Sequence, residues 1–424
     1  MQQAVSHIRQ IAAAVIGNAL EWYDFIVFGF FTTIISPLFF PSHDAHASLF
    51  LTMATFGAGF FTRPMGGVAF GLYSDRNGRK SALQLIILLM TVAVALIAFA
   101  PPYSSIGLFA PLLITSGRLL QGFATGGEFA SATTFLVEAA PSTKRGLYGS
   151  LQMVGQGFSA MLGTLAGIVV TTVLTPTQIT EWGWRIPFLI GLLIGPIGLY
   201  IRNHLDETDV FVRLQQSGAG RATLRGLLRE HRRALFVSFG LTVSSTIYFY
   251  VVLVYMPTYG KTELGLALGD AFIAQAAGLL FLIVLTPVFG SLSDRIGRRP
   301  LLIVANALFL LTLYPLFSWV QKEPSLTRLT MMQLIFCSMI AIASGPISTA
   351  LAEQFPTRIR STGLATGYNL AVMIFGGFAQ LIVAWLIDVL NTPVAPAFYV
   401  MFGASVGLLA SFVLTDRRRV SSLD

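Results

Sequence analysis

Five charged residues stand inside long apolar stretches, where an isolated charge is costly. Glu21 and Asp24 share the first stretch, Arg63 lies in the second, and Arg118 and Glu128 lie in the fourth. A charge at the centre of a lipid bilayer costs at least about 2.5–3.5 kcal/mol, so such residues should face a polar interior and a partner. Arginine binds carboxylates bidentately, and positioned carboxylates transfer protons. These residue types favour binding of an organic anion together with protons.

The composition indicates the surroundings of these charges. Hydrophobic residues make up 54% of the chain and charged residues 11%, where soluble domains average about 25% charged. The apolar stretches reach the roughly 20 residues that span a bilayer, and helices satisfy their backbone there. The net charge of +8 sits in short turns between these stretches, which argues against nucleic acid as a partner. The single Cys337 excludes intrachain disulfides and CxxC metal sites.

The hydropathy pattern predicts an all-α membrane protein with twelve transmembrane helices. The expected spans are 11–37, 47–71, 81–100, 106–137, 147–173, 186–202, 234–258, 268–290, 300–320, 328–350, 361–388 and 394–414. The first stretch follows a mostly polar start and continues as a span, so we expect no cleavable signal.

Two charged motifs each occur twice, about half a chain apart. The segment Gly71–Lys80 returns as Gly290–Arg299, and Glu138-x-x-Pro-x-x-x-Arg145 returns as Glu353-x-x-Pro-x-x-x-Arg360. Two different motifs with nearly the same offset indicate a duplicated unit. We therefore expect two pseudo-symmetric six-helix bundles.

The predicted halves are residues 1–202 and 234–424, and the polar segment 203–233 links them. Most of the 27 Lys and Arg residues fall on the side that holds the termini and this linker. The opposite side holds only four, which are Arg185, Lys261, Lys322 and Arg328. The positive-inside rule then predicts cytoplasmic termini in a cell (inner) membrane.

The motifs also resemble those of a known family. Gly-x-x-x-Asp-Arg-x-Gly-Arg-Arg/Lys after spans two and eight, and Arg118-Leu-Leu-Gln121-Gly122, resemble signatures of the major facilitator superfamily. Segments 18–25, 63–67, 126–128 and 182–188 resemble its metabolite:proton symporter branch, which includes carriers for citrate, tricarballylate, 2-oxoglutarate, shikimate and proline/betaine. Segment 255–260, followed by Thr262, is most similar to the citrate-type carriers.

This resemblance implies a monomeric secondary transporter without a cofactor, which imports a small carboxylate such as citrate with protons by alternating access. A symporter for another metabolite of that branch is the main alternative. An exporter of this superfamily usually carries a Gly-Pro-x-x-Gly-Gly run in span five, and Gly155-Gln156-Gly157 differs from it. A receptor or scaffold would not need matched motifs in both halves. The chain has no Gly-x-x-x-x-Gly-Lys-Ser/Thr run for an ATP-driven pump and no pattern that suggests an enzyme.

Polar residues at helical spacing supply the candidate binding site. Span four carries Arg118, Gln121, Thr125 and Glu128 within an arc of about 80°, which predicts one continuous stripe. The candidate substrate-binding residues are Arg63, Arg118, Gln121, Gln152, Gln156, Tyr248 and Tyr255, and the candidate proton carriers are Glu21, Asp24 and Glu128. In span seven Ser244, Tyr248 and Tyr255 are expected on one face. The alternative is that the charges form a structural ion pair and the amides and tyrosines only fix helix packing.

The repeated motifs supply the candidate gates. Resemblance implies that Asp75 ties to the neighbouring helix and to residues of the Arg145 type in the same half. The candidate gating residues are Asp75, Arg76, Arg79, Glu138, Arg145, Asp294, Arg295, Arg298, Glu353 and Arg360. The alternative is that these loops only set topology, but that role would not require an acidic residue and a glycine at fixed positions.

Overall fold

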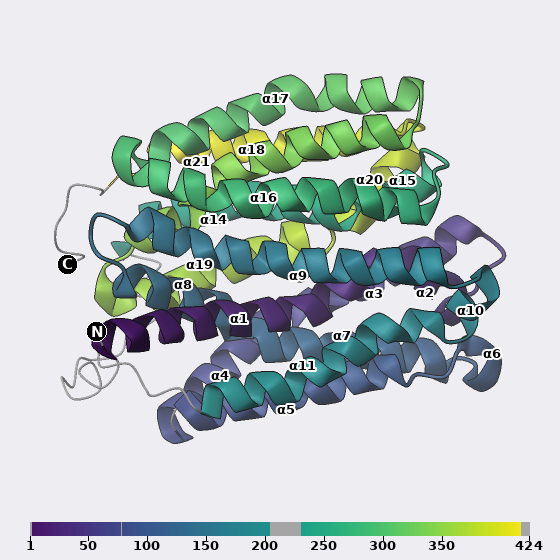
Figure 1. Cartoon of the computed structure of the whole chain (residues 1–424), viewed down its shortest axis with the longest axis horizontal. Coiled ribbons are helices and arrows are strands. Elements are labelled where there is room, and N and C mark those ends of the chain that lie inside the picture. The colour runs from purple at the N-terminus through teal and green to yellow at the C-terminus, as the bar shows by residue number, and fades with distance from the viewer. Residues whose placement is uncertain (1, 78, 204–229, 417–424) are drawn as a thin grey trace.

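The computed structural model describes residues 2–77, 79–203 and 230–416 (Figure 1). These ranges contain helices and no strand, which confirms the all-α prediction. The first part of the chain forms α1 (Gln2–Phe30), α2 (Thr32–Phe39), α3 (Ala45–Phe61), α4 (Arg63–Asn77), α5 (Arg79–Ala98), α6 (Tyr103–Ile106), α7 (Phe109–Ala124), η1 (Thr125–Gly127), α8 (Glu128–Ala139), α9 (Arg145–Val173), α10 (Pro176–Glu181), η2 (Gly183–Arg185) and α11 (Ile186–Asn203).

The second part forms α14 (Arg232–Ile247), η3 (Tyr248–Val254), α15 (Met256–Thr262), α16 (Leu268–Ile296), α17 (Arg298–Lys322), α18 (Leu326–Glu353), η4 (Thr357–Ile359), α19 (Arg360–Ala371), η5 (Val372–Gly376), α20 (Ala379–Leu390) and α21 (Ala395–Val413). Here η1, η2 and η4 are 3₁₀ turns, and η3 and η5 are π-helical turns. The predicted spans thus correspond to helices or to helices interrupted by short turns.

Seven helical segments in the described ranges are by themselves long and apolar enough to cross a membrane. They are Arg145–Val173, Arg232–Val254, Leu268–Ile296, Arg298–Lys322, Leu326–Glu353, Arg360–Leu390 and Ala395–Val413. An eighth would consist of Val15–Phe30 and Thr32–Phe39, which meet at a bend of 65°. Most uninterrupted spans lie in the second part of the chain, and the first part is more broken than the sequence pattern predicted.

Close glycine contacts explain the interruptions around Arg63 and Gly126. A Cβ atom on Gly66 would lie 1.7 Å from the carbonyl oxygen of Phe123, and one on Gly126 would lie 2.1 Å from that of Arg63. Backbones can approach this closely only where side chains are missing. The α3–α4 break and the η1 turn therefore pack main chain against main chain, and glycine is also a poor residue for a helix interior.

The long helices run along one common direction (Figure 1). We call the end at which α1 begins and α16 ends the charged end, because the repeated motifs lie there; it is on the left of Figure 1. Helices α9 and α16 lie side by side where the first and second parts of the chain meet. The predicted linker 203–233 lies mostly outside the described residues, so the division into halves stays a prediction.

Candidate functional site

Arg118 is completely buried near the middle of the bundle. Its Nη1 atom donates hydrogen bonds to Gln121 Oε1 at 2.7 Å and to the carbonyl of Phe25 at 3.3 Å, and its Nη2 atom donates to the carbonyl of Phe56 at 3.4 Å. The guanidinium lies 4.2 Å from the ring centroid of Phe25, 4.9 Å from that of Phe28 and 4.7 Å from that of Phe56. Neutral carbonyls and aromatic faces thus hold this cation, and its Nε atom has no partner.

Arg63 has a similar environment of aromatic rings and neutral hydrogen-bond acceptors. It is 3% exposed, its Nε atom donates to Thr125 Oγ1 at 3.2 Å, and its Nη1 atom has no partner. Its guanidinium lies 5.2 Å from the rings of Phe25 and Phe60 and 5.5 Å from that of Trp22. Both arginines contact the ring of Phe25, so two positive charges meet at one buried place.

The charge of this pair is not balanced by any described acidic side chain. Among the side chains that the structure describes, no Asp or Glu oxygen lies within 4.0 Å of a guanidinium nitrogen of Arg118 or Arg63. The alternative of a structural ion pair is therefore not seen for the described side chains. Cation–π contacts contribute about 0.5–2 kcal/mol each, while taking an ion out of water costs several kcal/mol. An anionic ligand would offset this cost.

The structure describes the surroundings of one candidate proton carrier in detail. Asp24 is 6% exposed and faces α11, because a Cβ atom on Gly191 would lie 1.8 Å from its Oδ1 atom. Its neighbour Tyr23 donates to the carbonyl of Pro187 on the same helix at 2.9 Å. Glu128 opens α8 directly after η1. The side chain of Glu21 lies outside the described residues.

The predicted stripe on span four is interrupted. Helix α7 ends at Ala124, the turn η1 covers Thr125–Gly127, and Glu128 begins a new helix. The reason is the main-chain contact of Gly126 with α4 described above. Gln121 and Thr125 still contact Arg118 and Arg63, respectively, so the break moves Glu128 rather than the residues before it out of the expected helical register.

The predicted amides on α9 are buried. Gln152 is 0% exposed and neither side-chain polar atom has a partner, and Gln156 is 4% exposed with a free Nε2 atom. On the same helix, Gly155 and Ser159 contact α1, whereas Gly157 and Thr164 contact α16. Helical spacing at 100° per residue places both glutamines between these two contact strips.

At the charged end, a carboxylate from the second part of the chain binds the start of α9. Asp294 accepts hydrogen bonds from the backbone N–H groups of Gly146 at 2.7 Å and Leu147 at 3.0 Å. Lys144 precedes this helix and provides no side-chain cap. A carboxylate at a helix N-terminus satisfies free donors and matches the helix dipole. Asp294 therefore caps a helix of the other predicted half.

Further polar contacts surround this cap. Arg298 contacts Asp294 at 2.9 Å and Glu353 at 3.2 Å, and Arg360 contacts Glu138 at 2.5 Å. The last pair and the hydrogen bond from Thr349 to the carbonyl of Arg145 at 2.8 Å join the two parts of the chain. Arg145 is buried, and the side chain of Arg295 is exposed.

The matching motif in the first half cannot be compared atom by atom. The side chains of Asp75, Arg76 and Arg79 lie outside the described residues, although their backbones are helical. The expected contact of Asp75 with residues of the Arg145 type thus stays a prediction. In the second part of the chain, the Arg298–Glu353 pair corresponds to Arg79 and Glu138 of the first motif copy.

The opposite side of the arginines is closed by apolar packing. A Cβ atom on Gly57 would lie 2.5 Å from the ring of Phe378, and one on Gly377 would lie 2.6 Å from the ring of Phe60. The ring centroid of Phe272 on α16 lies 6.0 Å from that of Phe31, which lies between α1 and α2. Helix α3 therefore interlocks with Gly377 and Phe378, which lead into α20, through two glycines and two phenylalanines.

Family comparisons agree with this architecture. The family described as Sugar (and other) transporter matches residues 10–223, and the Major Facilitator Superfamily matches residues 270–424. A citrate-proton symporter of Klebsiella pneumoniae is 36% identical over 96% of this chain and 91% of its own length. The chain belongs to the major facilitator superfamily. It is thus a multi-pass membrane transporter, and the twelve-helix fold of this superfamily accounts for the interrupted spans.

Relatives with other substrates in their names are also similar to this chain. A proline/betaine transporter of Salmonella typhimurium is 33% identical over 96% of this chain and 83% of its own length. The solved proton:xylose symporter XylE is similar in fold, with a TM-score of 0.76, 18% identity, and coverage of 96% of this chain and 95% of that one. Relatives with different printed substrates are nearly equally similar, so the superfamily alone leaves the substrate open.

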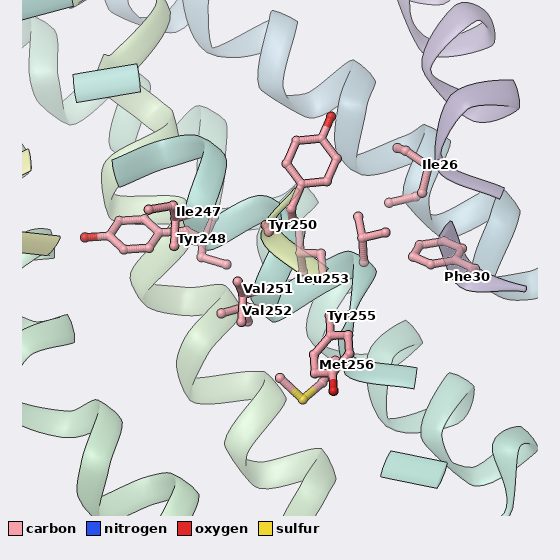
Figure 2. Close-up of a cluster of buried hydrophobic side chains, with 14 of the residues drawn as sticks. Ile26, Phe30, Ile247, Tyr248, Tyr250, Val251, Val252, Leu253, Tyr255 and Met256 are labelled. Carbon is pink, nitrogen blue, oxygen red and sulfur yellow. The ribbon is translucent and has the colours of Figure 1, made fainter. Parts of the chain in front are cut away.

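The tyrosines that lie near the arginine pair are not those that spacing predicted. Figure 2 shows Tyr248 and Tyr250 pointing in different directions from one helix. The hydroxyl of Tyr248 donates to Asn306 Oδ1 at 2.6 Å, and its ring stacks on Phe309 at 4.0 Å, both on α17. Tyr255 packs near Tyr259 toward the opposite end. Ser244 and Tyr248 both lie beside Asn306, so these two residues share a face, whereas Tyr255 lies beyond η3. Among the described side chains, neither tyrosine contacts an arginine.

The π-helical turn η3 lies between Tyr248 and Tyr255 and interrupts the α-helical spacing that links them. A π-turn holds more residues than the 3.6 of an α-helix, so residues beyond it rotate to another face. Tyr250, two residues after Tyr248, faces the other way, as it would in an ordinary α-helix, and its ring centroid lies 5.9 Å from that of Phe56 and 5.4 Å from that of Phe60, within electrostatic reach of both arginines. Tyr368 on α19 lies near Gln156 and Arg63 and stacks on Phe129 at 3.7 Å. The sequence shows that Tyr250 and Tyr368 are aromatic, but it does not show toward which helices their side chains point.

Proposed function

We propose that this transporter imports a small carboxylate with at least two negative charges, in the manner of citrate, together with protons. The observation that carries the proposal is the pair of buried guanidiniums, Arg118 and Arg63, which have no carboxylate among the described side chains and share the ring of Phe25. Two cations at one place match a polyvalent anion better than a zwitterion with one carboxylate. The similarity to citrate-proton symporters supports the same substrate class.

Aromatic rings contribute by leaving the arginines available. A guanidinium that is paired with a protein carboxylate would have to lose that partner before it could bind a substrate. The rings of Trp22, Phe25 and Phe56 hold the cations through their faces and leave the donors Arg118 Nε and Arg63 Nη1 unused. Arginine also offers a planar fork that matches a carboxylate, which lysine lacks.

Asp24 is the favoured proton carrier in this proposal. It lies beside Phe25, whose carbonyl accepts a hydrogen bond from Arg118, and it is buried against α11. Burial favours the neutral form of a carboxyl group. Substrate and proton would thus be linked through α1, without direct contact between them, while Glu21 and Glu128 stay as further candidates.

Protons that move inward across about 100 mV release roughly 2.3 kcal/mol per net charge. We expect Asp24→Asn to abolish uptake driven by a pH gradient while exchange of substrate between the two sides continues. Asp388→Asn, on α20, is the matched control. Accumulation at the wild-type level in Asp24→Asn would reject Asp24 as the carrier.

The substrate class is tested by counterflow uptake in proteoliposomes. The panel holds citrate, 2-oxoglutarate, shikimate and glycine betaine, each offered to vesicles preloaded with the same compound. The proposal expects the di- and tricarboxylates to exchange and betaine to fail. Exchange of betaine or shikimate alone would replace the proposal with the corresponding member of the same branch.

The proposed location is the cell (inner) membrane with both termini in the cytoplasm. A cysteine at Ser104, which is exposed before α7, should then react with an impermeant maleimide only from outside, after Cys337 has been replaced by Ser. The predicted cytoplasmic counterpart, Ser217, lies outside the described residues. Labelling of Ser104→Cys only from the cytoplasm would reverse the orientation.

A further inference from the structure

Three buried amide side chains lie on helices α1 and α9. Asn18 on α1 is 1% exposed, and neither of its side-chain polar atoms has a partner. Gln152 on α9 is in the same condition, and the Nε2 atom of Gln156 is also unpartnered. Most buried polar atoms in proteins are hydrogen-bonded, so a group of unpartnered amides needs an explanation.

The helices that carry these amides are packed together. A Cβ atom on Gly155, one residue before Gln156, would lie 3.8 Å from Asn18 Oδ1. The hydroxyl of Ser159, one turn beyond, donates to the carbonyl of Ala19. Helices α1 and α9 are therefore in contact at the level of these amides.

The same group continues toward the arginines. Asn18 and Phe25 are seven residues apart and share a face of α1, about 10 Å from each other along the helix. The ring of Phe25 contacts both Arg118 and Arg63. On the other side, Gln156 lies near Tyr368, which is itself within electrostatic reach of Arg63. The amides thus extend the arginine pair toward the charged end.

The chemistry of the two parts differs. The guanidiniums only donate hydrogen bonds and carry charge, whereas each amide both donates and accepts and carries none. A hydroxyl group also donates and accepts, so it satisfies an amide without bringing a charge. We propose that Asn18, Gln152 and Gln156 form a second, uncharged part of the substrate site, which selects hydroxy acids over the same acids without the hydroxyl group.

This inference rests on the proposed function, because the carboxylates must first be bound by Arg118 and Arg63. A site that hydrogen-bonds a substrate hydroxyl rejects the analogue without it strongly, since its buried polar groups are then left unpaired. The alternative occupant of the amides is ordered water, which would give no preference between the two acids.

The test compares citrate with propane-1,2,3-tricarboxylate, which is citrate without its hydroxyl group. Their dissociation constants are measured on the purified full chain by displacement of labelled citrate, or directly with the labelled analogue. The wild type should bind citrate at least tenfold more tightly. In Asn18→Leu and Gln152→Leu the ratio should fall to about one, because citrate loses affinity while the analogue keeps its own.

Gln354→Leu is the matched control, because this buried amide donates to the carbonyls of Ala350 and Thr415, away from the arginines. It should keep the wild-type ratio. A thermal unfolding midpoint at or above that of the wild type in the Asn18 and Gln152 variants would show that they fold.

The outcomes separate the two proposals. Equal wild-type affinity for both acids, or an unchanged ratio in the two variants, would overturn the hydroxyl-binding role and leave water as the occupant, while the arginine site would stand. If neither acid binds, the proposed function fails and the inference fails with it.

Discussion

At the charged end, Asp294 holds the start of α9 through two backbone N–H groups, and Arg360 pairs with Glu138 across the join. On the opposite side of the arginines, the same two parts of the chain meet through Gly57 and Gly377, which receive the rings of Phe378 and Phe60. The charged end is held by ion pairs and directional hydrogen bonds. The opposite side is held by the complementary shapes of glycine and phenylalanine residues. Among the described side chains, no ion pair joins α3 to α20.

The two ends should therefore open in different ways. Polar contacts at a membrane surface can be exchanged for water, so their loss is partly compensated. An apolar interlock has no such substitute, but it also has no directional bond to break, and it fails abruptly when a methyl group is added. We therefore expect a charge change at the charged end to lower the transport rate in part. An added side chain at the opposite end should abolish transport almost completely.

The largest expected effect is that of bulk at Gly57. A Cβ atom there already lies 2.5 Å from the ring of Phe378, so Gly57→Val should keep α3 and α20 apart and reduce transport more than 100-fold. Uptake is measured together with maleimide labelling of a cysteine at Ser104. Ala58→Val is the control, because Ala58 is only partly buried. Near-normal transport by Gly57→Val would show that this interlock is not needed.

A smaller effect is expected from charge at Asp294. Asp294→Asn removes the charge from the start of α9 and leaves one acceptor oxygen for two donors, so transport should slow about tenfold with nearly unchanged substrate affinity. Asp270→Asn on the same helix, near its other end, is the control. The comparison between the ends would break if Asp294→Asn changed affinity as much as rate, or changed neither.

The smallest effect is expected for the Arg360–Glu138 pair. Arg360 is fully buried and Glu138 is partly exposed, so we expect a coupling energy of about 1–3 kcal/mol in a double-mutant cycle. The cycle combines Arg360→Gln and Glu138→Gln, and the readout is the equilibrium between labelled and protected Ser104→Cys. Additive effects of the two substitutions would mean that the pair does not hold the charged end.

The helical fold was predictable because hydropathy and motif repetition act along the chain. Apolar stretches predicted the long helical regions but not short helices such as α10, and the paired motifs marked the ends at which Asp294 and Glu138 lie. What could not be predicted depends on contacts between distant segments. Gly126 interrupts a helix because the main chain of Arg63 lies against it, and no local pattern carries that information.

The candidate site shows the same limit. Arg118, Arg63 and Gln121 were identified because polar residues in an apolar stretch are rare, whatever their facing. Tyr255 was placed on the face of Ser244 and Tyr248 by α-helical periodicity, which the π-turn between Tyr248 and Tyr255 interrupts. The direction in which a side chain points depends on whether the local helix is an α-helix or a π-helix. An argument from residue spacing assumes an α-helix throughout.

The central claim is that the buried guanidinium of Arg118 binds the anionic substrate. Its most direct test is citrate binding to purified Arg118→Lys, with thermal unfolding as a check of the fold. Lysine keeps the charge but loses the planar fork, so the dissociation constant should rise at least 100-fold while the unfolding midpoint changes little. A dissociation constant within about threefold of the wild-type value would contradict the claim and make Arg118 a structural cation.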